Sequence, residues 1–179
     1  MQIERTNEEI LIRVPSETDL VGLQRILDYI RFRGIASKST KIVFSALLTP
    51  NGSISDILLN SSGTFDFFTP TFLLEELAHH HQKLLKLSAY SEQDLSFMKR
   101  MVLKKNEFID LELISDLFWK KAIKMTTPID EFDAPFVALS LALGASLWTG
   151  DKKLAKGLRL QKIDWAVNTA DLEVIRDRS

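Results

Sequence analysis

The sequence contains no cysteine, and it has no apolar run long enough to cross a membrane. The missing thiol excludes disulfides, zinc sites built on thiolates and cysteine nucleophiles. The longest apolar stretch, Phe136 to Trp148, falls well short of the ~18 residues that indicate a transmembrane helix. Residues 1–30 carry charges throughout and lack the apolar segment of a signal peptide. We therefore expect a cytoplasmic protein with no membrane partner.

Neither sign of charge predominates, because 23 Lys and Arg residues face 24 Asp and Glu residues, for a formal net charge of −1. No global field then attracts nucleic acid, and such a partner requires a local basic patch. Glycine is scarce, and the sequence has neither a glycine-rich nucleotide loop nor a nucleophile elbow. The 179 residues are enough for one domain with a sizeable core.

The chain begins with a short strand and an amphipathic helix. Residues 9–14 predict a strand that Pro15 ends, and apolar residues at helical spacing predict a helix over 16–33. The small, polar stretch 36–40 is the best candidate for a linker. We therefore expect an N-terminal strand–helix segment at residues 1–38 and a second unit over residues 39–179.

The second unit alternates helical and strand patterns. Strands are predicted at 64–69, 145–149 and 164–168, and helices at 42–48, 53–59, 70–87, 91–104, 115–124, 132–143 and 151–160. Residues 108–113 are ambiguous, and a polar tail follows residue 168. This alternation predicts an α/β fold with a short parallel sheet that helices cover on both faces.

Two acids are placed where a sheet edge could bring them together. Asp133 opens an apolar helix, and Asp151 follows the strand that this helix leads into. A helix and a returning strand can bring both carboxylates to one edge, where they would suit Mg²⁺ or Mn²⁺. Asp151 could instead cap the next helix, and Thr149 could orient a water or a phosphate. Asp130 shares a helix face with Asp133, although the helix dipole alone accounts for an acid there.

A further acid and three histidines lie on the helix predicted over 70–87. Glu76 shares a side with Phe72 and Leu73, which are expected to be buried, whereas Glu75 is expected to face solvent. Glu76 is thus either a third site acid or a surface residue. The histidines at 79–81 diverge around the helix, so a solvated face is favoured over a metal site.

A basic stripe follows Asp151. It comprises Lys152, Lys153, Lys156, Arg159 and Lys162. A solvated charged face is the ordinary explanation. The position beside a proposed metal site makes contact with RNA phosphates the alternative, which we assign to Lys152, Lys153 and Lys156.

Three segments resemble the PIN-domain family, the metal-dependent ribonuclease fold common among bacterial toxin–antitoxin toxins. They are Phe68-Thr69-Pro70 to Glu76-Leu77, residues 133–139, and Thr149-Gly150-Asp151. The resemblance covers about residues 39–170. It implies a three-layer α/β/α fold, Mg²⁺ or Mn²⁺ as cofactor, and RNA as substrate, with a cognate antitoxin as a possible partner. It also implies catalytic and metal-binding roles for Glu76, Asp133 and Asp151, with Asp130, Thr149 and Ser39 as accessory positions.

The chain departs from this family at the start of the domain. Members typically open with an apolar strand that ends in Asp-Thr-Asn, followed by an apolar helix. The helix is present at 42–48, but Ser39 stands where the first acid belongs and Lys41 stands where Asn is usual. No apolar strand precedes Ser39. A neutral hydroxyl and an added cation should weaken divalent-metal binding, so we expect activity to be reduced or absent.

Residues 9–39 resemble short antitoxin-type proteins encoded beside such toxins, although ordinary divergence of one polypeptide is an alternative. The strand at 9–14 is the only spare one that could fill the central position of the sheet. An unfilled position would expose strand edges, so we expect a homodimer or a higher oligomer.

Three functions remain open from the sequence. They are an impaired metal-dependent endoribonuclease, a non-catalytic PIN module that binds RNA or a protein partner, and a structural remnant whose N-terminal segment mediates assembly.

Overall fold

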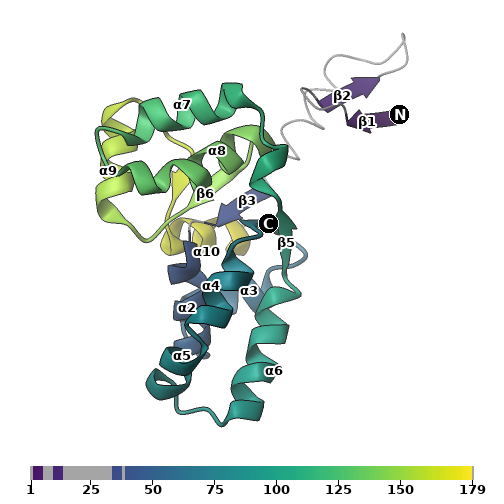
Figure 1. The fold of residues 1–179 in the computed structure, drawn as a ribbon, viewed down its shortest axis with the longest axis vertical. Coiled ribbons are helices and arrows are strands. Elements are labelled where there is room, and N and C mark those ends of the chain that lie inside the picture. Colours follow the sequence, from purple (N-terminus) through teal and green to yellow (C-terminus); the bar gives the residue numbers. More distant parts are fainter. Residues whose placement is uncertain (1, 6–9, 14–33, 38, 179) are drawn as a thin grey trace.

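The computed structural model in Figure 1 describes residues 2–5, 10–13, 34–37 and 39–178. The strands are β1 (Gln2–Arg5), β2 (Ile10–Arg13), β3 (Gly34–Ser37), β4 (Asp66–Pro70), β5 (Asn106–Ile109), β6 (Ser146–Trp148) and β7 (Ala166–Val167). The α-helices are α2 (Ser39–Leu48), α3 (Ser53–Asn60), α4 (Leu73–His79), α5 (His81–Leu87), α6 (Glu92–Leu103), α7 (Asp116–Thr126), α8 (Ala134–Leu143), α9 (Lys152–Leu160) and α10 (Thr169–Asp177). Two short 3₁₀ turns are η1 (Leu111–Leu113) and η2 (Glu131–Asp133). The helix predicted over 16–33 lies outside the described residues.

Five strands form one parallel sheet in the order β5-β4-β3-β6-β7. The central strand β3 aligns Ile35 with Phe67 of β4 on one side and with Ser146 of β6 on the other. β1 and β2 form a separate antiparallel pair. Parallel strands need crossover connections, and the helices between them supply these.

The two faces of the sheet carry separate apolar cores. On one face, Ile35, Phe67 and Trp148 pack with buried residues of α2 to α6 and α10. On the other face, Leu147 and Ala166 pack with buried residues of α7, α8 and α9. Trp148 and Leu147 are neighbours on β6 and point to opposite faces, as the strand period requires. Figure 1 shows α7, α8 and α9 on one side of the sheet and α2 to α6 on the other. The predicted three-layer α/β/α fold is confirmed.

The linker predicted at 36–40 is wrong. Ala36 and Ser37 belong to β3, and Ser39 begins α2. A Gly-Ile-Ala-Ser segment has weak intrinsic strand preference, and pairing on both sides makes it a strand here. The central position is therefore filled by residues assigned above to the N-terminal segment, and β2 does not fill it. An empty central position no longer argues for an oligomer.

Several element boundaries differ from expectation. Pro70 ends β4 instead of starting a helix, and the helix predicted over 70–87 breaks at His80 into α4 and α5. α3 begins at Ser53, as predicted, and Gly52 is its N-cap. Ser91 caps α6 and accepts a hydrogen bond from the amide of Asp94 at 3.2 Å. Within the described residues, no single helix is long and apolar enough to cross a membrane.

The predicted polar tail is a helix. α10 begins with a capping box in which the Asn168 side chain accepts from the Asp171 amide and the Asp171 carboxylate accepts from the Asn168 amide. Leu172 is fully buried. Arg176 donates to Asp56 of α3 at 2.5 Å, and this ion pair connects α10 to α3. Hydrogen bonds from Asn60 and from Arg176 lower the pKa of Asp56.

We predict that the stability contribution of this pair depends on pH. A carboxyl with a lowered folded-state pKa stabilises the fold above its unfolded pKa, about 3.9, and this contribution is lost as the pH falls through the folded-state value. Arg176→Met should therefore lower the melting temperature at pH 7, and the difference from the native chain should shrink below about pH 4. The exposed Arg178 provides the matched control, Arg178→Met, which should change neither. An equal loss at pH 7 and pH 3 would contradict the role of the ion pair.

Candidate functional site

The strand order creates a switch point at the carboxyl end of the sheet. From β3 the chain moves to β4 and β5 on one side, and β6 and β7 lie on the other. Crossovers leaving β3 and β6 thus diverge to opposite faces of the sheet. At the end of these two strands, Ser37 pairs with Trp148. In open α/β sheets, ligands bind in the crevice beside such a point.

The fold places Asp133 toward this edge. α8 ends at Gly144, which adopts a left-handed φ of 61°, and the chain enters β6 directly afterwards. The amino end of α8 therefore points to the carboxyl edge of the sheet. Asp133 sits at that end as the helix N-cap and is only 5% exposed. A carboxylate buried at the switch point is costly without a local function or a compensating environment.

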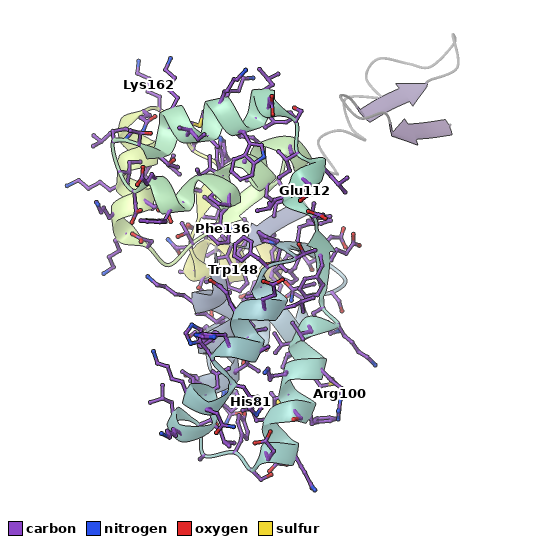
Figure 2. All side chains as sticks on the ribbon, viewed as in Figure 1. His81, Arg100, Glu112, Phe136, Trp148 and Lys162 are labelled. Carbon is purple, nitrogen blue, oxygen red and sulfur yellow. The ribbon has the colours of Figure 1, made fainter. Side chains whose placement is uncertain are left out.

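The start of α4 lies against the start of α8. Phe72 at the N-cap of α4 packs edge-to-face on Phe136 of α8 (labelled in Figure 2), with ring centroids 5.7 Å apart. This contact brings the helix that bears Glu76 beside the helix that Asp133 caps. Glu75 is exposed, as predicted, and Glu76 is half-buried. Glu76 Oε2 is buried and has no hydrogen-bond partner among the described residues.

Thr149 and Asp151 belong to a hydrogen-bonded turn after β6. Thr149 is buried, its amide donates to Val167 of β7 at 2.9 Å, and its Oγ1 accepts from the Asp151 amide at 3.0 Å. Asp151 Oδ1 accepts from the amides of Lys153 at 2.8 Å and Leu154 at 3.1 Å, so it caps α9. The capping alternative for Asp151 is confirmed, and Thr149 orients the turn backbone.

Asp130 also acts as a cap. Its Oδ1 accepts from the Phe132 amide at 3.1 Å and starts the 3₁₀ turn η2. η2 separates Asp130 from α8, so the two acids do not share a face of one regular helix. Phe132, expected inside the apolar helix, is 80% exposed beside Asp133. The local role explains Asp130 without a part in chemistry.

The acids at this edge do not make up a metal-binding set by themselves. Among the described residues, no group of three or more His, Asp and Glu side chains is arranged to hold a metal ion. Glu76, Asp133 and Asp151 lie on elements that meet at one edge, yet their side chains do not converge as three ligands. The donors described here therefore do not fit a complete divalent-metal centre.

The histidines at 79–81 have different surroundings. His80 contacts Phe44 edge-to-face with centroids 5.6 Å apart, and the rings of His79 and His80 are 5.0 Å apart. His81 is labelled in Figure 2; its Nε2 lies 2.5 Å from Glu92, and its Nδ1 lies 3.1 Å from the Lys99 ammonium. Burial lowers the pKa of Lys99. The solvated face predicted for all three is thus wrong for His81, which joins α5 to α6.

A surface hollow of about 450 Å³ adjoins the Asp151 turn. Its lining comprises Thr149, Gly150, Asp151, Lys152, Ala155, Lys156, Arg159, Leu160 and Asn168. Two of the three predicted RNA-binding lysines, Lys152 and Lys156, belong to this lining, and Lys153 does not. The sequence placed Arg159 in the basic stripe but not among the predicted RNA-binding residues, and it gave no role to Asn168. Their helical spacing and capping pattern could have indicated their positions, but only the fold shows that they face the same hollow.

α9 approaches the loop before Asp133 very closely. A Cβ built on Gly157 would lie 2.5 Å from Cγ1 of Ile129, and the Gln161 side chain donates to the Met125 carbonyl at 2.8 Å. Only glycine permits this approach, because Ile129 is β-branched and its Cγ atoms cannot move far. The contact fixes α9 against the segment that leads to Asp133.

We predict that Gly157→Ala destabilises the protein by about 1–3 kcal/mol, because it overpacks this contact. In an unconstrained helix the same change would stabilise by about 1 kcal/mol. Ile129→Ala should relieve the overpacking. In a double-mutant cycle measured by urea unfolding, the double variant should therefore be more stable, by at least about 1 kcal/mol, than the sum of the two single effects predicts. A stabilising Gly157→Ala would show that the helix and the loop do not touch.

We also predict that the capping role of Asp151 can be separated from its charge. Asp151→Ala should cost about 1 kcal/mol of stability, whereas Asp151→Asn should cost much less because asparagine caps equally well. Both variants should lose any Mn²⁺ affinity that depends on this carboxylate. Urea unfolding and calorimetric titration measure the two effects, and equal destabilisation by both variants would contradict the capping role.

Comparison with known proteins identifies the family of this chain. A family model described as PIN domain matches residues 39–173, well over half of the chain. No curated protein and no solved structure matches it. The matched segment begins directly after β3, so the central strand precedes the part that the family model covers. The chain therefore belongs to the PIN-domain family, whose members are generally nucleases that use divalent metal ions.

Proposed function

We propose that this chain is a ribonuclease-type PIN domain of the toxin–antitoxin class whose metal-dependent cleavage is weak or lost and which still binds RNA. One observation carries the proposal. The position that follows the central strand at the switch point, Ser39, holds a neutral hydroxyl where the resemblance to the family calls for the first acid.

Charge balance explains why this position matters. Carboxylates set the affinity of a hard, oxygen-liganded divalent ion, and each lost carboxylate weakens the site. Ser39 contributes no charge, and Lys41, two positions further on, contributes a positive one. The lack of a three-donor group among the described residues supports the same conclusion. The remaining acids are Asp133 and Asp151 as the main ligand candidates, with Glu76 as a direct or water-mediated third.

RNA binding does not need the missing acid. The net charge of −1 offers no general attraction for RNA, so binding depends on a local cluster of cations. Lys152 and Lys156 stand beside the Asp151 turn, close to the edge where a PIN domain would hold its substrate. A non-catalytic module that binds RNA is the second candidate function, and this basic lining favours it over a purely structural remnant. A cognate antitoxin and a homo-oligomer remain proposals for its partners.

Restoring the missing carboxylate tests the proposal. Ser39→Asp should raise Mn²⁺ affinity and Mn²⁺-dependent cleavage of structured RNA at least about tenfold, the scale on which even outer-shell groups change metal sites. Ser39→Asn is the matched control, since it has the same shape without the charge, and it should behave like the native chain. Calorimetric titration and gel-based cleavage at neutral pH provide the two readouts.

Two results would refute the proposed impairment. One is robust cleavage by the native chain that Ser39→Asp leaves unchanged. The other is an equal gain from Ser39→Asn, which would mean that shape and not charge limits the site. If cleavage is gained, Asp133→Asn and Asp151→Asn in the Ser39→Asp background should each abolish it, because both carboxylates would then be needed.

A further inference from the structure

The hollow beside the Asp151 turn has the architecture of an anion site. It opens where the neighbouring parallel strands β6 and β7 end, between Thr149 after the first strand and Asn168 after the second. One wall is the face of α9 that carries Lys152, Lys156 and Arg159. The volume, about 450 Å³, is in the range of pockets that hold a group of nucleotide size.

The charges in this lining are mostly uncompensated. Its three cations have no ion pair or hydrogen bond with another described residue. Asp151 is the single acid among the lining residues, and its Oδ1 accepts from two amides of α9. The first turn of α9 carries no acid and two lysines, against the preference of the helix dipole. An anionic ligand would relieve this repulsion.

The arrangement fits an extended polyanion better than a single small anion. Lys152, Lys156 and Arg159 are spaced four and three residues apart, so they line one helix face over about 10 Å. Leu160, also in the lining, is 78% exposed and offers apolar surface that a nucleobase can cover. A free phosphate could use neither the length of the cationic row nor the apolar rim.

The fold also divides the basic stripe of the sequence. Lys153 and Lys162 belong to the stripe but not to the lining of the hollow. Lys162 lies after α9 in a left-handed conformation, with φ of 62°, and projects away from the domain in Figure 2. The same number of charges can therefore be removed inside or outside the hollow, so that two variants change the net charge equally.

We infer that the hollow between α9 and the start of α10 binds the phosphodiester backbone of single-stranded RNA, with Lys152, Lys156 and Arg159 as the phosphate contacts. This inference rests on the proposed function, because it takes RNA as the substrate class. A strand held here runs past Asp151 toward the switch point, so the hollow positions RNA beside the acids. Arg159 thereby joins Lys152 and Lys156 as a phosphate contact.

The test compares two triple variants in fluorescence anisotropy titrations with a labelled single-stranded RNA, in EDTA and over a range of salt concentrations. The hollow variant is Lys152→Gln, Lys156→Gln and Arg159→Gln, since glutamine retains helix propensity. We expect its Kd to rise about tenfold or more and the slope of log K against log salt to fall by about 2, at ~0.7 for each lost contact. The control, Lys120→Gln, Lys124→Gln and Lys162→Gln, removes three exposed cations that lie outside the hollow and should change both quantities little.

The outcomes separate this inference from the proposed function. If the native chain binds no RNA, both fail. If the native chain binds RNA and the hollow variant binds equally well, only the hollow assignment fails. Equal weakening by both variants would reveal nonspecific attraction and overturn the assignment. Inorganic phosphate should displace the RNA only weakly, and full displacement by an equal concentration of phosphate groups would show a small-anion site instead. Unchanged thermal melting of both variants verifies that the fold is intact.

Discussion

Parallel pairing on both sides of β3 holds the domain together. Without this strand, β4 with β5 and β6 with β7 would be two separate pairs, since no other strand joins β4 to β6 in the described sheet. Ile35 is 1% exposed and belongs to the core beneath α2 to α6. The strand also ends beside β6, so the same hydrogen-bonded ladder that closes the sheet creates the crevice in which the candidate site lies.

Hydrogen-bonded turns and close packing at the ends of these paired strands position the residues of the site. Thr149 is buried between the ends of β6 and β7, and its hydroxyl orients the turn that presents Asp151. Gly157 permits α9 to approach Ile129, which fixes the segment that leads to Asp133. Each acid is therefore held by backbone geometry. Such positioning persists whether or not a complete set of metal ligands is present, which is why a PIN domain can lose cleavage without losing its fold.

Binding and cleavage make different physical demands on this edge. Cleavage of RNA with a divalent ion needs several carboxylates in one small volume, and under the proposed function the neutral Ser39 stands in place of one of them. Binding of a phosphate backbone needs only cations spread along a groove, and these are present on α9. The proposed loss of a carboxylate at position 39 would thus weaken the first property and leave the second intact.

Local patterns in the sequence were sufficient to predict α8, its stop at Gly144, β6 and the capped start of α9, because each rests on hydrogen bonds and periodicity within a few residues. They were also sufficient to indicate that Asp133 and Asp151 belong near one sheet edge. Tertiary structure alone decided the rest. β3 is a strand because of its two neighbours, and its own residues have little preference for one. α10 is a helix that its packing and its pairing with Asp56 hold in place. Which lysines share a hollow, and whether three acids converge as ligands, depends on side-chain directions across elements distant in sequence, and no local pattern encodes those directions.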